Sequence, residues 1–417
     1  MKGAASGPAF VFEPLFHRCS FATVTGNVTI RVHPGNDRER SGEQSEKAAN
    51  PLGRACRPMP TMPRLSAPVP AAGEDADEEP GSGGGWPYPW LLADIGGTNA
   101  RFGWLASGSA EVTQVATLNA ADHAGPAEAA RAYLRGLEQT LGAAYRAPRA
   151  GALAVATAVG GDHIALTNSG WEFSRLATRK GLGLDELLVL NDFEALALAL
   201  PRLRATQVRT IGPARVGWPD AAARGALAVI GPGTGLGVAG LLPTPHGWVA
   251  VPGEGGHASL SPADDFEGEL LRVVRRAFAH VSAERLLSGI GLPVLHGAVA
   301  EVLGRPAPVP APSTGEIVER GLSGADEVCS ACLDSFCALL GSFAGNVALV
   351  LGARGGVYIG GGIVPRLGER FFASRFRERF EAKGRFQAYL QAIPTALITD
   401  TLVALAGAAA ALEARPR

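Results

Sequence analysis

Short apolar runs alternate with longer stretches of helical spacing from about residue 89 to the C-terminus. The runs GALAVATAVGG, LLVLND and ALAVIGPG are typical of buried strands. A helix is expected to begin near Asp192 and to end at Pro201, where the proline ring blocks its continuation. Another is expected over about residues 327–351, before a strand at GVYIGGG. The alternation predicts an α/β fold. In PAEAARAYLRGLEQTLGA the helical spacing places these residues on one face: Ala130, Tyr133, Leu134, Leu137 and Leu141.

Residues 1–88 have a different pattern, rich in Pro, Gly, Ser and Ala, and end in AAGEDADEEPGSGGG before WPYP. Such a segment buries too little apolar surface to offset its ordering entropy, so we interpret it as a disordered leader. The three methionines of the chain, Met1, Met59 and Met62, all lie in it. We therefore consider the hypothesis that translation starts at Met59 or Met62, so that residues 1–61 are missing from the mature protein.

Composition narrows the class of protein. The 417 residues are 47% hydrophobic with a formal net charge of -1. This size favours two domains, and no basic excess points to nucleic acid. Five cysteines are an odd number that suits a reducing compartment, so we expect a cytoplasmic protein. Cys329, Cys332 and Cys337 lie in an apolar helical stretch without a paired Cys or His motif, which favours core residues over a metal site. The apolar run 402–412 is too short to span a membrane.

Two stretches, LLADIGGTNARFGWL and LAVIGPGTGLGVAGL, share one plan of strand, Gly/Thr turn and strand. A repeat separated by about 135 residues suggests two similar domains, each opening with the same hairpin. Glycines let successive backbone N–H groups face an anion without a Cβ in the way. The simpler alternative is two hairpins without a ligand, but the matched turns favour phosphate. A third cluster follows the strand GVYI. The predicted phosphate-facing residues are Gly96, Gly97, Thr98, Asn99, Gly233, Thr234, Gly235, Gly237, Gly360, Gly361 and Gly362.

Asp94 precedes the first turn, where a carboxylate suits a Mg²⁺ ion or its bound water between acid and phosphate. Other nucleotide motifs do not fit. The chain has no Gly-Lys dipeptide and so no P-loop, and GPGTGLG has leucine at the sixth position of the Rossmann G-x-G-x-x-G pattern.

A polar group of residues surrounds further strand ends and loops. Asn191 and Asp192 follow the strand LLVL, Glu254 and His257 flank a Gly-Gly pair, and Glu284 lies in HVSAERLLSG. Each alone would be read as a surface or structural residue, and Asp192 could be the N-cap of its helix. Together these carboxylates, amide and imidazole suit the many hydroxyls of a sugar.

The chain resembles the bacterial glucokinases that are distinct from the ROK kinases, within the actin-like sugar-kinase superfamily. The motifs LADIGGTNARFGW, LTNSGWEFS, LNDFEALALALP, GPGTGLGVA, PGEGGHASLSP, HVSAERLLSGIG, GGVYIGGGIVPRL and KGRFQAYLQAIP occur in the family's order from about Trp90 onward. The ROK cysteine-rich zinc motif is missing. Two departures stand out: Ala158 where proline is usual, and TDTLVALAG in place of an Asn-Pro-Gly turn before the last helix.

The resemblance implies two actin-like (ribonuclease H-like) α/β domains flanking a ligand cleft. A small domain would span 90–202 plus 397–417 and a large one 203–396. It further implies a glucokinase that uses ATP and Mg²⁺ to phosphorylate the 6-hydroxyl of glucose, the first step of glycolysis. Asp192 would be the general base. Asn191, Glu254, His257 and Glu284 would bind the sugar with it, and the three glycine turns would bind the nucleotide.

Family analogy also implies a homodimer without nucleic-acid or membrane partners. Two alternatives on the same fold stay open: a non-catalytic sugar sensor, and a chaperone-like or filament-forming ATPase. The sensor would be expected to lose Asp192, and the ATPase would have no need of the sugar-binding set. The sequence leaves open the breadth of sugar specificity and the choice of phosphoryl donor.

Overall fold

The structure, a computed structural model, describes residues 85–108, 111–166, 169–213, 225–306 and 309–415. Contacts divide the chain into Met1–Glu78 and Glu79–Arg417, and every described residue lies in the second unit. The proposed start sites, and the leader up to residue 84, lie outside the described residues. Residues 85–88 belong to the folded part, because Tyr88 stacks on Trp90 at a centroid distance of 4.3 Å and the Trp86 carbonyl accepts a hydrogen bond from Trp90 Nε1 (3.2 Å).

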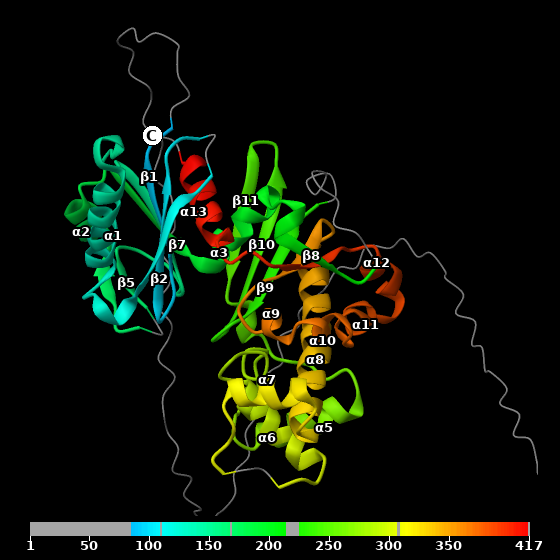
Figure 1. Cartoon of the computed structure of the whole chain (residues 1–417). Coiled ribbons are helices and arrows are strands. Elements are labelled where there is room, and N and C mark those ends of the chain that lie inside the picture. The colour runs from blue at the N-terminus through cyan, green and yellow to red at the C-terminus, as the bar shows by residue number, and fades with distance from the viewer. Residues whose placement is uncertain (1–84, 109–110, 167–168, 214–224, 307–308, 416–417) are drawn as a thin grey trace, which may run out of the picture. The chain divides into compact units, whose positions relative to one another are not determined.

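The first sheet has the order β3-β2-β1-β4-β7 and buries both faces (Figure 1). Alternate residues of β1 explain this: Leu91 packs toward α1 and Leu92 toward α13. β1 pairs antiparallel with β2 and parallel with β4, so the first predicted hairpin is confirmed. The elements are β1 (Trp90–Ile95), β2 (Asn99–Leu105), β3 (Thr113–Asn119), α1 (Pro126–Leu141), β4 (Ala150–Val155), α2 (Arg175–Leu182), β7 (Glu186–Asn191) and α13 (Val403–Glu413), with β5 (His163–Ala165) and β6 (Glu172–Ser174) forming a separate pair.

The second sheet has the order β11-β10-β9-β12-β13-β8. Here β9 and β10 form the second predicted antiparallel hairpin, and β12 runs parallel to β9. Its strands are β8 (Val208–Ile211), β9 (Leu227–Pro232), β10 (Leu236–Thr244), β11 (Gly247–Gly253), β12 (Gly356–Ile359) and β13 (Thr395–Ile398). The helices that follow in this half are α5 (Asp265–Arg275), α6 (Leu292–Val302), α7 (Thr314–Ser323), α8 (Glu327–Leu351), α9 (Val364–Leu367), α10 (Glu369–Phe372), α11 (Phe376–Glu381) and α12 (Gln387–Gln391).

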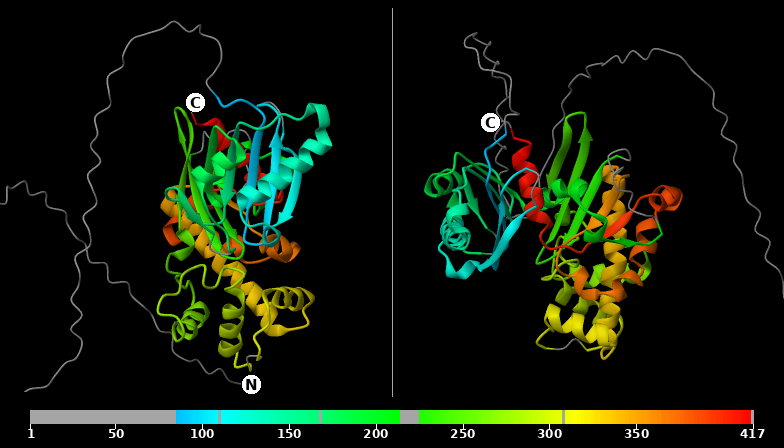
Figure 2. Two further views of the ribbon diagram at one scale, coloured as in Figure 1. Left: turned by 90° about the vertical axis from the view of Figure 1, so that its left-hand side faces the viewer. Right: turned by 45° about the horizontal axis from the view of Figure 1, so that its top comes forward.

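Helix α3 (Asp192–Ala199) lies with α13 between the two sheets (Figure 1), and the right-hand view of Figure 2 shows α13 there. Its sequence DFEALALA is apolar on nearly every side, which is typical of a helix buried all round. Ala195 packs with the first sheet, whereas Ala197 and Leu200 pack with the second. The helix ends at Ala199, just before Pro201, in agreement with the prediction. The element that carries Asp192 therefore contacts both sheets.

The segment TDTLVALAG, at which the sequence departs from the family it resembles, is held by several contacts. Gln207 accepts a backbone hydrogen bond from Thr399 and donates through Nε2 to Asp400 (2.6 Å). Helix α13 then begins at Val403. Gly407 lets α13 approach α3 closely, because a Cβ at this position would lie 1.7 Å from the Ala195 carbonyl oxygen. The last helix thus packs on the first sheet without the usual turn.

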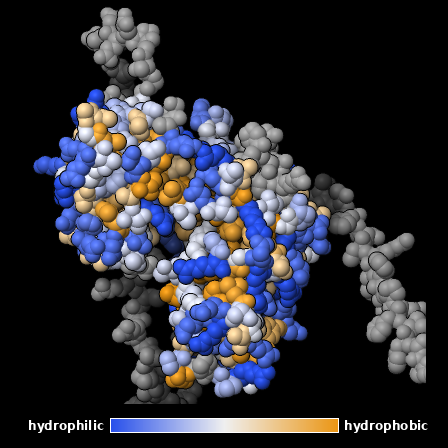
Figure 3. Space-filling view, viewed as in Figure 1, coloured by the Kyte–Doolittle hydropathy of each residue, from blue (hydrophilic) through white to orange (hydrophobic). Residues whose placement is uncertain are grey.

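Helix α8 begins at Glu327 and ends at Leu351, as predicted, and is the central helix of the larger core. By length and composition alone it could cross a membrane, yet 67% of its most apolar window is buried inside the protein. Cys329, Cys332 and Cys337 are free thiols buried on this helix, which confirms that they lie in the core. On the face shown in Figure 3, apolar side chains gather in separate groups among hydrophilic ones.

Candidate active site

The turn between β1 and β2 closes with a hydrogen bond from the Gly96 amide to the Asn99 carbonyl (2.9 Å). Thr98 and Asn99 are exposed at its tip. Among the described residues, no protein acceptor faces the amides of Gly97 and Thr98. Two consecutive free N–H groups beside exposed polar side chains can receive an anion.

The turn between β9 and β10 has the same property. Its carbonyls at Gly233 and Thr234 accept hydrogen bonds from the amides of Gly289 (2.8 Å) and Ile290 (3.4 Å). Within the described part of the chain, the amides of Thr234 and Gly235 meet no acceptor. The neighbouring segment therefore binds the carbonyl side of the turn and leaves the N–H side open.

The third glycine cluster lies directly against the second turn. The amides of Gly360 and Ile363 donate to the carbonyls of Ile230 (2.8 Å) and Pro232 (3.1 Å), at the end of β9. Gly361 has φ +76°, and a Cβ there would lie 2.5 Å from the Pro232 oxygen, so only glycine fits. A Cβ on Gly362 would meet nothing within 4 Å. Two of the predicted phosphate turns thus share one edge of the second sheet.

Asn191 and Asp192 lie where β7 ends and α3 begins. Asn191, not Asp192, is the N-cap: its Oδ1 accepts hydrogen bonds from the amides of Phe193 (2.9 Å) and Glu194 (3.3 Å). Its Nδ2 donates to the Thr157 carbonyl (3.1 Å). The capping alternative for Asp192 is therefore wrong. Its carboxylate shares the Phe193 amide (2.9 Å) with Asn191, and its own amide and the Asn191 side chain also act on it.

Asp192 has the chemistry of a general base. Burial, followed by the nearby charge of Asp94, raises its pKa to about 7, against the opposing effect of the backbone hydrogen bond from Phe193. A carboxyl group with a pKa close to neutral can accept a proton and release it again. Asp94, at the end of β1, is also desolvated, which raises its pKa despite an ion pair with Arg101 at 3.5 Å. The two carboxylates are close enough for each charge to affect the other.

Phe193, which the sequence analysis did not single out, positions Asp192 relative to the second turn. Its ring lies over Gly231 and Gly237, which are paired across β9 and β10. A Cβ on either glycine would come within 2.3 Å of that ring. Gly237 thus lies inside β10 and leaves space for Phe193, and Gly360 similarly leaves space for Leu196 of α3. The only sign of this contact in the sequence was the two glycines. That they pair with each other and face an aromatic residue far away in sequence becomes visible only when the register of β9 and β10 is known.

Glu254, His257 and Glu284 come together beside the same turn. His257 Nε2 lies 3.9 Å from Glu254 Oε2 and 3.8 Å from Glu284 Oε1. Glu254 and His257 are exposed, whereas the Glu284 side chain is mostly buried. Glu284 Oε2 accepts a hydrogen bond from the Leu236 amide (2.8 Å) and would lie 2.5 Å from a Cβ on Gly235. Glu284 therefore contacts both the polar group and the glycine turn.

Through these contacts each predicted group of residues lies next to another. Asp94 influences Asp192, Phe193 packs on the β9–β10 hairpin, and Glu284 lies against the turn of that hairpin. The donor set fits a magnesium polyphosphate, because Mg²⁺ uses one or two carboxylates and keeps water and phosphate ligands, while open amides suit phosphate oxygens.

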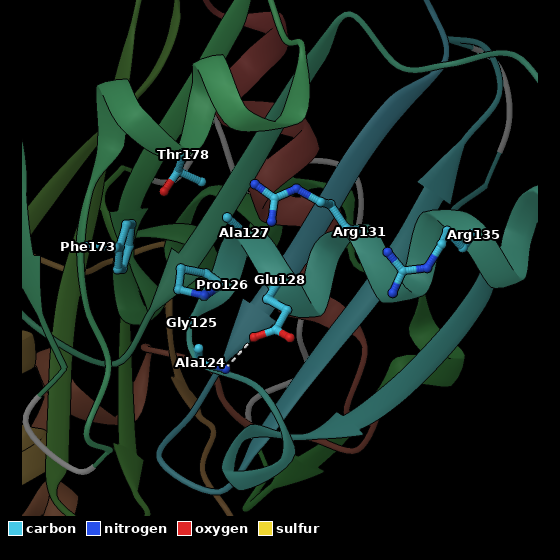
Figure 4. Close-up of a pocket in the computed structure, with 9 residues that line it drawn as sticks. All are labelled: Ala124, Gly125, Pro126, Ala127, Glu128, Arg131, Arg135, Phe173 and Thr178. Carbon is cyan, nitrogen blue, oxygen red and sulfur yellow. Dashed lines mark hydrogen bonds between the residues drawn. The ribbon is translucent and has the colours of Figure 1, made fainter.

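A different pocket, of about 480 Å³, lies between α1 and α2 (Figure 4). Arg131 and Arg135 extend from α1 around it, and Glu128 accepts a hydrogen bond from the Ala124 amide (2.7 Å). None of the predicted site residues lines this pocket. It is therefore separate from the candidate active site.

Comparisons with known proteins show what the chain is similar to. The model of the family described as Glucokinase matches residues 91–415. The glucokinase of Chromobacterium violaceum is 50% identical over 325 residues, which are 78% of this chain and 89% of that protein. A "bifunctional protein glk" of Paraburkholderia xenovorans is 45% identical over 82% of this chain, and the chain spans only 51% of its length.

Among solved structures, the glucokinase of an Antarctic psychrotroph has a TM-score of 0.69 and 38% identity, with 78% of this chain and 98% of that one covered. The family match includes both sheets and all three glycine turns, since it extends over nearly the whole described part of the chain. On these findings, the chain belongs to the glucokinase family.

Proposed function

We propose that the protein transfers the γ-phosphoryl group of ATP to the 6-hydroxyl of glucose, giving glucose 6-phosphate and ADP. The observation that carries the proposal is Asp192, a buried carboxyl with a pKa of about 7. Phe193 packs its helix against the hairpin whose turn, 233–235, offers open amides. A proton acceptor beside a phosphate site is what phosphoryl transfer to a hydroxyl requires.

In this mechanism, Asp192 accepts the proton of the sugar 6-hydroxyl as the oxygen attacks the γ-phosphate. The Asn191 cap fixes the start of α3, and the Phe193 ring keeps that start beside the turn. Glu254 and Glu284 can accept hydrogen bonds from sugar hydroxyls, and His257 can donate or accept one. The exposed positions of Glu254 and His257 leave them accessible to a sugar.

The open amides of the two hairpin turns would hold the phosphates, with the third glycine cluster packed against the second turn. Mg²⁺, when bound with ATP, would neutralise phosphate charge during the transfer. We assign Asp94 to the Mg²⁺ side of the site, with a water molecule between the carboxylate and the ion. The ion pair between Asp94 and Arg101 is long, at 3.5 Å, and leaves carboxylate oxygen available.

We also propose that the two sheets mark two domains, 90–202 plus 397–417 and 203–396, with the ligands between them. Closure over the sugar would exclude water from the phosphoryl group. A homodimer and a cytoplasmic location remain predictions that rest on family analogy and on cysteine usage.

A coupled assay of ADP release, with and without glucose, tests the proposed function. Glucose-dependent release that is lost on chelation of Mg²⁺ supports a glucokinase. Glucose binding without ADP release would instead indicate a sugar sensor, and release unaffected by glucose would indicate an ATPase. A panel of mannose, glucosamine and alternative phosphoryl donors would then define the specificity.

A further inference from the structure

Three potential ligands of one metal ion meet far from the glycine turns in sequence. His296 lies on α6, Asp326 is the N-cap of α8, and Cys329 lies in the first turn of that helix. Their ligand atoms all lie within 4.8 Å of one another. None of the three is part of the proposed catalytic or sugar-binding set. No sequence motif indicates the group, because 30 residues separate His296 from Asp326 along the chain.

His296 is the unusual member. It is only 2% exposed, and within the described part of the chain no hydrogen bond reaches either ring nitrogen. The described residues thus leave the ring nitrogens available to a ligand. Imidazole is a common metal ligand in proteins.

The other two members keep capacity for a ligand bond. Asp326 Oδ1 accepts the Cys329 amide (2.9 Å) as a helix cap, and the Cys329 thiol donates to the same carboxylate, a contact that a cation would replace. Cys329 is fully buried, and its thiol faces the Asp326 carboxylate. The cationic side chain that acts on this thiol, Arg320, is paired with Glu316 at 3.3 Å. Capping explains Asp326 and core packing explains Cys329, but neither explains the buried His296.

We propose that His296, Asp326 and Cys329 bind one divalent cation of the zinc type, with water as the fourth ligand. A nitrogen, oxygen and sulfur donor set matches Zn²⁺ better than Mg²⁺. With Zn–S of about 2.3 Å and Zn–N of about 2.0 Å, tetrahedral donors lie about 3.5 Å apart, so the side chains close by about 1 Å on binding. The Cys329 thiol loses its proton to solvent as the Zn–S bond forms.

Such an ion would join the start of α8 to α6, and its role would be structural. Asp326 is only partly buried, which provides a path for the ion from solvent. Because metal binds the folded state, Zn²⁺ is expected to raise the midpoint of thermal unfolding. Glucose phosphorylation, if the proposed function holds, depends on other residues and should not require this ion.

The test uses the full chain, freed of metal with a chelator and titrated with Co²⁺. Wild type should bind one ion and show a sulfur-to-cobalt charge-transfer band. Cys329→Ser should lose the band and at least about 10-fold in affinity. Cys337→Ser is the matched control, since Cys337 is a buried cysteine of the same helix outside the group, and it should behave as wild type.

His296→Gln provides a second variant, and circular dichroism checks that each variant is folded. Wild type without a thiolate band at excess Co²⁺, or without a change in thermal midpoint on adding Zn²⁺, would overturn the proposal. A band of equal strength in Cys329→Ser would overturn it too. The wild-type titration alone decides the matter if a variant does not fold, and it is independent of kinase activity.

Discussion

Replacement of Asp192 by asparagine should stabilise the protein at alkaline pH while sharply lowering turnover. The pKa of Asp192 is about 7 in the folded state, against an ordinary value of 3.8. Between these values the folded state holds a proton that the unfolded state has lost. The free energy of unfolding therefore falls as pH rises from about 4 to about 7. A pKa difference of about 3 corresponds to about 4 kcal/mol, which is an upper bound because the side chain keeps some contact with solvent.

The Asp192→Asn variant would keep an acceptor for the Phe193 amide but carry no charge at this position. We expect the variant and wild type to have similar stability near pH 4, and the variant to be more stable by up to about 4 kcal/mol at pH 8. Urea unfolding at several pH values, without ligands, measures the difference. In the coupled assay, the same variant should lose about 10²–10⁴ in kcat and still bind glucose.

Asp265→Asn is the matched control, because Asp265 is also the first residue of a helix, α5, but is exposed. The difference in free energy of unfolding between Asp265→Asn and wild type should hardly change with pH. A difference between Asp192→Asn and wild type that is constant with pH would refute the burial argument. Near-normal kcat in that variant would remove Asp192 as the base.

Three further substitutions, one of them with a control, test other contacts. Asp94→Asn should move the acidic limb of the kcat/KM profile to lower pH, because the Asp94 charge raises the pKa of the base; an unchanged limb would contradict their coupling. Gly237→Ala should displace the Phe193 ring, cost about 1–3 kcal/mol in urea unfolding and lower kcat more than it changes KM. Gly407→Ala should lower the thermal midpoint through a clash between α13 and α3, whereas Gly136→Ala, in open space on α1, should raise it through about 0.5–1 kcal/mol of helix propensity.

Much of the fold was predictable because it depends on local pattern. The face of α1 and the bounds of α8 follow from helical spacing, and both glycine hairpins follow from strand, turn and strand signals. The predicted face of α1 is buried or partly buried in the core of the first sheet. These features could be predicted because they depend only on residues that are close together along the chain.

The relations among the site residues could not be predicted from single motifs. The contact of Phe193 with Gly231 depends on how α3 packs on the second sheet. The hydrogen bond from Leu236 to Glu284 joins residues 48 apart in sequence. The sequence analysis considered Asp192 as a possible cap of α3, whereas Asn191 has that position; the two residue types have almost equal preference for it.

The start of α3 therefore determines acidity as well as structure. If the helix began one residue later, Asp192 would be the cap. Its carboxylate would then accept hydrogen bonds from the amides two and three residues on, as Asn191 now does from Phe193 and Glu194. Hydrogen bonds to the charged form lower a carboxyl pKa. The order Asn-Asp thus yields a carboxyl of near-neutral pKa at the position of the proposed base. The reversed dipeptide would cap the helix equally well, but with a carboxylate whose pKa is lowered by the capped amides. The acidity of the proposed base therefore depends on the position of a helix boundary to within a single residue.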